Sequence, residues 1–250
     1  MMGKKDINII SDIEDMISDF RHRTGEDPSS VLNDLLDYII GYLDPTGAPI
    51  QGWNHNAEEN QKLYGMMIRY FELMEKQLGK VDWFDAFGDL IMSMRTKGGG
   101  FEQYFTPTGI CNLMVKTMSY ADLEMAKISG RYVISDPTCG SSRNLLAAHA
   151  KLIGDNRPAP YVVAEDIDIL CCKISAVNLA VHGCFGEVVC HNTLIEPESL
   201  RSGYLVNHLL YAGHTGVPTI TRSTDPSDFL ACDMWKKRKR KSNQQLSLDF

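Results

Sequence analysis

The chain has 250 residues, of which 44% are hydrophobic and 23% are charged, a composition typical of globular proteins. Its apolar stretches are far shorter than a membrane span, and its N-terminus turns acidic where a signal peptide would stay apolar, so we expect a cytoplasmic protein. Seven scattered cysteines without C-x-x-C spacing argue against a zinc site and against a disulfide framework, and we expect no metal.

The net charge of −7 is unevenly distributed along the chain. Residues 236–241 read KKRKRK, and Asp249 is the only acid after them, so the last fifteen residues carry +5. This leaves −12 for residues 1–235. Electrostatic attraction to nucleic acid is therefore expected mainly from the tail.

The first part of the chain carries helical signals and almost no strand signals. Apolar residues recur at helical spacing in four segments, 7–20, 27–43, 56–79 and 82–95. The sequence KGGG at 97–100 then interrupts the pattern. We therefore predict an N-terminal helical region over residues 1–97.

After this break, short β-branched runs alternate with longer helical segments. The predicted strands are 131–135, 161–165 and 187–190, and the helices between them are 141–153 and 170–183. Such alternation is typical of βαβ units with a parallel sheet, so we predict an α/β domain over 98–235. Its first strand would leave an exposed edge, and we expect 217–222 or another chain to cover it.

The loop after the first predicted strand reads SDPTCGSSRN, residues 135–144. In an open parallel sheet, ligands bind where such loops leave the carboxyl ends of strands. Pro137 favours an extended Asp136, and Gly140 permits a tight turn or close approach of the backbone. The loop lacks the lysine of a phosphate-binding P-loop and the three glycines of a dinucleotide fingerprint.

The third ligand class has no phosphates but has a cationic end and ribose hydroxyls. Asp136 fits this class, because its carboxylate can pair with an ammonium group. The second strand ends at Glu165 and Asp166. Their separation from Gly140 along the sequence is the one expected for a carboxylate that binds a ribose. S-adenosylmethionine fits this pattern. The alternative is a strand–helix turn that binds no ligand.

Four ordered segments carry a specific resemblance. QYFTPTGICNLMV, DPTCGSSRNLL, AEDIDILCCKISAVNLAVHG and HNTL follow one another between residue 98 and about residue 195. Together they resemble the adenine-N6 DNA methyltransferases, specifically the modification subunits of type I restriction systems. The resemblance implies a partial Rossmann-like S-adenosylmethionine methyltransferase sheet in the α/β domain.

The resemblance also implies roles for individual residues. The methionine end of the cofactor would contact three residues of the first segment, Phe105, Thr106 and Pro107. The other cofactor contacts would be Asp136 and Gly140 at the carboxypropyl and amino groups, Asp166 on the ribose and Asn192 near the adenine. Two positions depart from the family pattern: Ser142 replaces a glycine, and Asn192 replaces an aspartate.

The family activates the target amine with the tetrapeptide Asn-Pro-Pro-aromatic, whose polar groups accept hydrogen bonds from the amine and whose ring stacks on the flipped base. This chain has ten prolines and no two are adjacent, so the tetrapeptide is absent. The nearest candidates are Asp225, Pro226 and Phe229, in the wrong spacing. A turn leading into a short helix explains them equally well.

Three interpretations follow. The chain is an S-adenosylmethionine-binding protein with weak or no catalysis on its own, or an active site-specific adenine-N6 DNA methyltransferase. Alternatively, it is a clamp-docked DNA-binding accessory protein without cofactor. Methylation of something other than DNA has no support in the sequence.

The tail, residues 236–250, is polar and charged until its last few residues and is predicted to be disordered over 236–244. Its basic run, Lys236–Lys241, is either a DNA-binding arm or a solubilising tail. The final QLSLDF resembles the hexapeptide by which bacterial replication proteins bind the sliding clamp. Its anchors would be Gln245, Leu246, Leu248 and Phe250. Partners of the whole chain would be DNA, the clamp, and a catalytic or specificity subunit.

Overall fold

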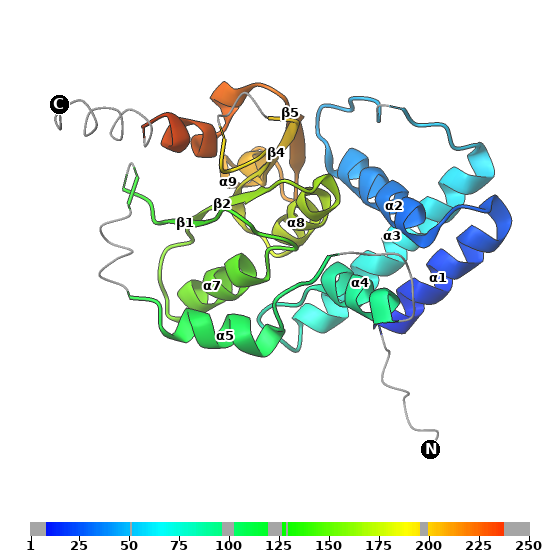
Figure 1. Cartoon of the computed structure of the whole chain (residues 1–250), viewed down its shortest axis with the longest axis horizontal. Helices are drawn as coiled ribbons and strands as arrows, with labels where there is room; N and C mark the ends of the chain where they lie inside the picture. The colour runs from blue at the N-terminus through cyan, green and yellow to red at the C-terminus, as the bar shows by residue number, and fades with distance from the viewer. Residues whose placement is uncertain are drawn as a thin grey trace, which may run out of the picture. The chain divides into compact units, whose positions relative to one another are not determined.

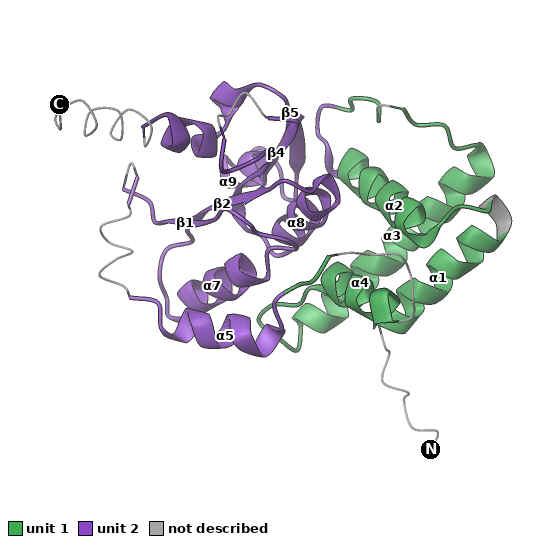
Figure 2. Ribbon diagram, in the orientation of Figure 1, with its two compact units in different colours: residues 1–42, 47–105 green, residues 43–46, 106–250 purple. Residues whose placement is uncertain are grey.

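The structure is a computed structural model that describes residues 9–50, 52–96, 103–119, 127–128, 130–195 and 200–237. The chain divides into two compact units, one formed by residues 1–42 and 47–105 and the other by 43–46 and 106–250 (Figure 2). The helical unit thus extends eight residues beyond the predicted boundary at residue 97. Among the described helices, none combines the length and the apolar content that crossing a membrane requires.

The first unit consists of helices (Figure 1). They are α1 (Ile9–Thr24), α2 (Pro28–Leu43), α3 (Ala57–Leu78) and α4 (Ala86–Thr96). The apolar residues at helical spacing form its core, where the rings of Tyr70 and Phe87 stack with centroids 4.5 Å apart. The Asn56 side chain and Glu59 form a reciprocal capping box that fixes the start of α3.

The second unit is α/β and begins with α5 (Thr108–Lys116). Its strands are β1 (Val133–Asp136), β2 (Tyr161–Asp166), β3 (Phe185–Cys190), β4 (Ser202–Val206) and β5 (Ile220–Ser223). The helical elements among them are α7 (Arg143–Gly154), α8 (Ile169–Val181), α9 (His208–Tyr211) and the 3₁₀ helix η2 (Pro226–Asp228). Residues 230–237 are also helical and are called the C-terminal helix below.

The five strands form one sheet in the order β1-β2-β3-β4-β5. β1, β2 and β3 are parallel, as predicted from the βαβ pattern, whereas β4 and β5 are antiparallel additions beside β3. The prediction that 217–222 covers the edge of β1 is wrong, because β5 pairs with β4 at the opposite edge. Within the described residues, no strand pairs with the outer edge of β1.

Both faces of the sheet are covered (Figure 1). The connections from β1 to β2 and from β2 to β3 step in the same direction, and right-handed crossovers place α7 and α8 on one face. On the other face, Phe229 and Cys232 pack against Val163 and Val189. The C-terminal helix therefore completes the core of this unit.

A buried carboxylate anchors the C-terminal helix to the sheet. Glu187 in β3 accepts hydrogen bonds from the backbone N–H groups of Leu230 (3.0 Å) and Ala231 (2.7 Å) and from the Tyr161 hydroxyl (2.6 Å). Burial raises the pKa of Glu187. Lys236 and Lys237 belong to this helix, so the predicted disorder is wrong for these two residues, and the rest of the tail lies outside the described residues.

Candidate functional site

Three of the predicted cofactor residues lie at the carboxyl ends of the three parallel strands. Asp136 is the last residue of β1, Asp166 is the last residue of β2, and Asn192 follows β3 by two residues. The register pairs Asp136 with Ala164 and Asp166 with Cys190, so the strand ends lie at the same edge of the sheet. This is the edge at which open parallel sheets bind ligands.

The loop after β1 is fastened to the end of β2. The backbone N–H of Cys139 donates to the Glu165 carbonyl at 2.9 Å, and the N–H of Gly140 donates to Asp166 Oδ2 at 2.9 Å. Gly140 has φ +55°, a conformation that glycine adopts without steric cost. Two residues predicted to bind the cofactor are therefore in direct contact.

The Asp166 carboxylate accepts two backbone hydrogen bonds in this arrangement. Besides Gly140, it accepts the backbone N–H of Asp168 at Oδ1 (2.9 Å), just before α8. Each carboxylate oxygen has a second lone pair, so Asp166 can hold the loop and still accept a hydrogen bond from a ligand hydroxyl.

Ser142, the departure from the family glycine, adopts φ +67°. This is the left-handed region, which is unfavourable for residues that carry a Cβ. Its buried hydroxyl is hydrogen-bonded to the hydroxyl of Ser175 in α8. The side-chain contact therefore offsets part of the strain that a glycine would avoid.

The cysteine of this loop is buried and weakly acidic. Cys139 Sγ lies 3.8 Å from Ser175 Oγ, and burial raises the pKa of the thiol. A thiol that stays protonated is a poor nucleophile, so the structure gives Cys139 a packing role.

Asp136 contacts two neighbours. Its Oδ1 accepts the backbone N–H of Thr138 at 3.1 Å, and its Oδ2 lies 3.4 Å from Nδ2 of Asn144, the second residue of α7. Asn144 Oδ1 is buried and has no hydrogen-bond partner. Sequence reasoning missed Asn144, because only the folded loop brings it to Asp136.

The aromatic-Thr-Pro segment is divided between the two units. Phe105 is buried and is the last residue of the helical unit, whereas Thr106 belongs to the α/β unit. Arg143 at the start of α7 donates from Nη1 to the Thr106 carbonyl at 3.2 Å, and Pro107 is the N-cap residue of α5. The hydrogen bond from Arg143 thus links Thr106 to α7, the helix that follows the loop after β1.

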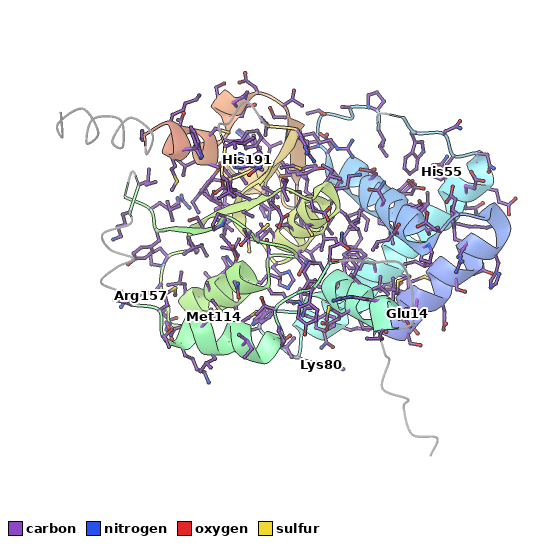
Figure 3. All side chains as sticks on the ribbon, viewed as in Figure 1. Glu14, His55, Lys80, Met114, Arg157 and His191 are labelled. Atoms are coloured by element: carbon purple, nitrogen blue, oxygen red, sulfur yellow. The ribbon has the colours of Figure 1, made fainter. Side chains whose placement is uncertain are left out.

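The ends of β2 and β3 also carry a polar pair, formed by Glu165 and His191. The buried imidazole of His191, labelled in Figure 3, has Nε2 2.7 Å from Oε2 of Glu165. The His191 backbone N–H donates to the Asp166 carbonyl at 2.9 Å. The next residue, Asn192, uses its side-chain oxygen to accept the N–H of Leu194 at 3.0 Å. The contact between Glu165 and His191 was not predicted from the sequence.

The three candidates for amine activation do not form a site. Asp225 accepts the backbone N–H (2.8 Å) and the hydroxyl (2.7 Å) of Ser227 and so caps η2. Pro226 is the first residue of that helix. Phe229 is 1% exposed and lies in the core under the C-terminal helix, where its ring cannot stack on a base.

The residues at the strand ends fit S-adenosylmethionine. A ligand with an ammonium group and ribose hydroxyls requires acceptors, and Asp136, Asp166 and the buried oxygen of Asn144 provide them. Gly140 adds a backbone that presents no side chain. When bound, this cofactor would supply an electrophilic methyl group.

Among its described residues, the helical unit contains one group of potential metal ligands. Atoms of Glu26, Asp34 and His55 lie within 4.8 Å of one another. Here His55 Nε2 contacts Asp34 at 3.0 Å, and Nδ1 contacts Glu59, the capping-box carboxylate, at 3.3 Å. These contacts link α2 to the start of α3.

The chain has a distant similarity to a solved structure. A Listeria monocytogenes protein assigned to the class I S-adenosylmethionine-dependent methyltransferases aligns over 76% of this chain with 12% identity and a TM-score of 0.47. The match covers 55% of that protein, so this chain spans little more than half of its length. No curated protein matches the chain significantly.

The scan against protein families gives a clear result. The family described as N-6 DNA methylase matches residues 82–207, which is half of the chain. The matched region contains α5, the loop after β1, the acid at the end of β2 and the end of β3. The chain therefore belongs to the N-6 DNA methylase family.

Proposed function

We propose that the chain binds S-adenosylmethionine at the strand ends and has weak or no methyltransferase activity on its own. The observation that carries the proposal is the hydrogen bond between Gly140 and Asp166, which holds the loop after β1 against the acid at the end of β2. Asp136 would then pair with the ammonium group, and Asp166 would accept the ribose hydroxyls. Phe105, Thr106, Pro107 and Asn192 remain proposed contacts.

Weak catalysis is proposed because the groups that would activate an exocyclic amine are missing. The sequence has no Asn-Pro-Pro-aromatic segment, Asp225 is engaged in a turn, and Phe229 is a core residue. Without acceptors for the amine protons, its lone pair stays delocalised in the base, and transfer of a methyl group is slow.

We further propose that a catalytic or specificity subunit binds at the outer edge of β1. In doubly wound sheets, the first strand is flanked by strands on both sides, and the ligand lies where the strand order reverses. Here β1 is the last strand on its side among the described residues, and Ser135 is exposed there. A strand from a partner would supply the reversal and bring its own loop to the cofactor.

The proposed substrate is DNA, as the family suggests, within a restriction–modification setting in the cytoplasm. Lys236–Lys241 would bind phosphates, and Gln245, Leu246, Leu248 and Phe250 would bind the sliding clamp. All but Lys236 and Lys237 lie outside the described residues. The family match also supports the alternative of an active site-specific adenine-N6 methyltransferase.

The test combines binding and transfer. Calorimetry on the purified chain should detect S-adenosylmethionine, and Asp136→Ala should weaken its binding about tenfold or more because a charge-assisted contact is lost. Asp233→Ala, which removes an exposed acid from the C-terminal helix, is the matched control. Binding that is unaffected by Asp136→Ala would contradict the proposed site.

Incubation with labelled S-adenosylmethionine and unmethylated DNA tests catalysis. The isolated chain should transfer little or no label. Vigorous transfer that Asp136→Ala abolishes would refute weak catalysis and favour the active enzyme. Adding a purified candidate subunit should raise transfer by the native chain, and Ser135→Pro, which removes an edge N–H of β1, should prevent this increase.

A further inference from the structure

Asn144 is a polar residue at the methyl-donor site to which no role has been assigned. It is the second residue of α7, the helix that follows the loop after β1. Its Nδ2 faces Asp136 Oδ2 at 3.4 Å. Because a carboxylate only accepts hydrogen bonds, this contact orients the amide with its NH₂ group toward Asp136 and its carbonyl oxygen away.

The carbonyl oxygen of Asn144 is buried without a hydrogen-bond partner. A buried acceptor that remains unsatisfied destabilises a protein, so such atoms call for a ligand or an ordered water. The neighbouring Asp136 is itself an acceptor with lone pairs to spare, since it receives one backbone N–H and the Asn144 amide. The two side chains are in contact and each keeps acceptor capacity, so a group that donates several hydrogen bonds could serve both.

We propose that Asn144 Oδ1 accepts a hydrogen bond from the α-ammonium group of S-adenosylmethionine, beside Asp136. An ammonium group has three donors, and its positive charge complements the carboxylate. Asn144 would then have two functions, since it positions the Asp136 side chain and contacts the amino-acid end of the cofactor. The inference rests on the proposed function.

The test uses ligands that differ at the amino-acid end. S-adenosylmethionine and S-adenosylhomocysteine carry the ammonium group, whereas 5′-methylthioadenosine keeps the nucleoside and lacks it. Asn144→Leu preserves the shape of the side chain and removes both polar atoms, and Asn144→Gln keeps both the amide donor and the carbonyl acceptor. Ile153→Ala, at an exposed position near the other end of α7, is the control.

For Asn144→Leu we expect the Kd of both ammonium-bearing ligands to rise about ten- to hundredfold, the effect of losing a hydrogen bond to a charged group. The Kd of 5′-methylthioadenosine should change less than about twofold. Asn144→Gln should retain most of the binding of the ammonium-bearing ligands, and Ile153→Ala should behave like the native chain.

Each other outcome overturns the inference. If Asn144→Leu binds all three ligands normally, Asn144 contacts none of them. If it loses all three equally, the residue supports the loop and not the ammonium group. If the native chain binds none of the ligands, the proposed function fails as well, which distinguishes that failure from the first two.

Discussion

The most direct test of the loop is at Ser142, where a residue with a Cβ has φ +67°. Two substitutions remove the hydroxyl and differ only in the Cβ, namely Ser142→Gly and Ser142→Ala. Left-handed backbone costs an L-residue about 1–2 kcal/mol, and glycine loses about 0.5–1 kcal/mol through its greater freedom when unfolded. The glycine variant should therefore be more stable than the alanine variant by about 1 kcal/mol.

Comparing the free energy of unfolding of each variant with that of the native chain gives the contribution of the Ser142 hydroxyl. Both variants leave Ser175 without its hydroxyl partner, with only the weak Cys139 thiol contact at 3.8 Å. Losing this buried bond should cost about 1–2 kcal/mol. Relief of strain should bring Ser142→Gly back close to the native stability, while Ser142→Ala should lose the full amount.

Urea unfolding followed by circular dichroism measures these differences, provided that the slopes stay equal. Adding Ser175→Ala to each variant should recover some stability, because the orphaned hydroxyl is removed. Equal stability of the glycine and alanine variants would refute the left-handed conformation. A strongly destabilised glycine variant would show that the hydroxyl contact outweighs the strain.

Three further predictions concern the core of the α/β unit. Burial lowers the pKa of His149 from 6.5 to about 4, so its stabilising contribution is present above pH 6.5 and lost as the pH falls toward 4; urea titrations should show a loss of about 2 kcal/mol at pH 5 that His149→Leu abolishes. Gly203→Ala would place a Cβ 2.2 Å from the buried ring of Phe229, which should cost about 1–3 kcal/mol in thermal unfolding, whereas Gly216→Ala, with no neighbour within 4 Å, should cost little. Glu187→Ala should uncap the C-terminal helix and lower stability by about 2 kcal/mol, with faster amide exchange in that helix; unchanged exchange would contradict the capping role.

The parallel half of the sheet could be predicted because its signals are local. Each strand is a short run with β-branched residues, and β1 and β2 are each followed by a helix of more than ten residues. The acids at the strand ends follow from the same pattern, since a side chain just after a buried strand lies at the edge of the sheet. The sequence therefore places Asp136 and Asp166 at the strand ends, as the structure has them.

The antiparallel half could not be predicted, because its determinants are far apart in the sequence. Gly203 lies inside β4, where glycine weakens the strand signal. The structure explains this glycine through Phe229, whose ring occupies the space that a Cβ would need. The same burial removes Phe229 from the candidates for base stacking, and neither fact is visible without the fold.

The edge of β1 connects these observations to function. Because both crossovers step in one direction, α7 and α8 cover the same face, and the strand order never reverses within the described residues. Open sheets bind their ligands at such a reversal. This chain therefore forms one side of the expected site, with Asp136 and the loop after β1. If the proposed function is correct, the opposite wall and the acceptors for the target amine come from a strand that pairs with β1. Binding of the methyl donor and transfer of the methyl group would then be properties of different assemblies, and a subunit that leaves the β1 edge accessible could not activate transfer.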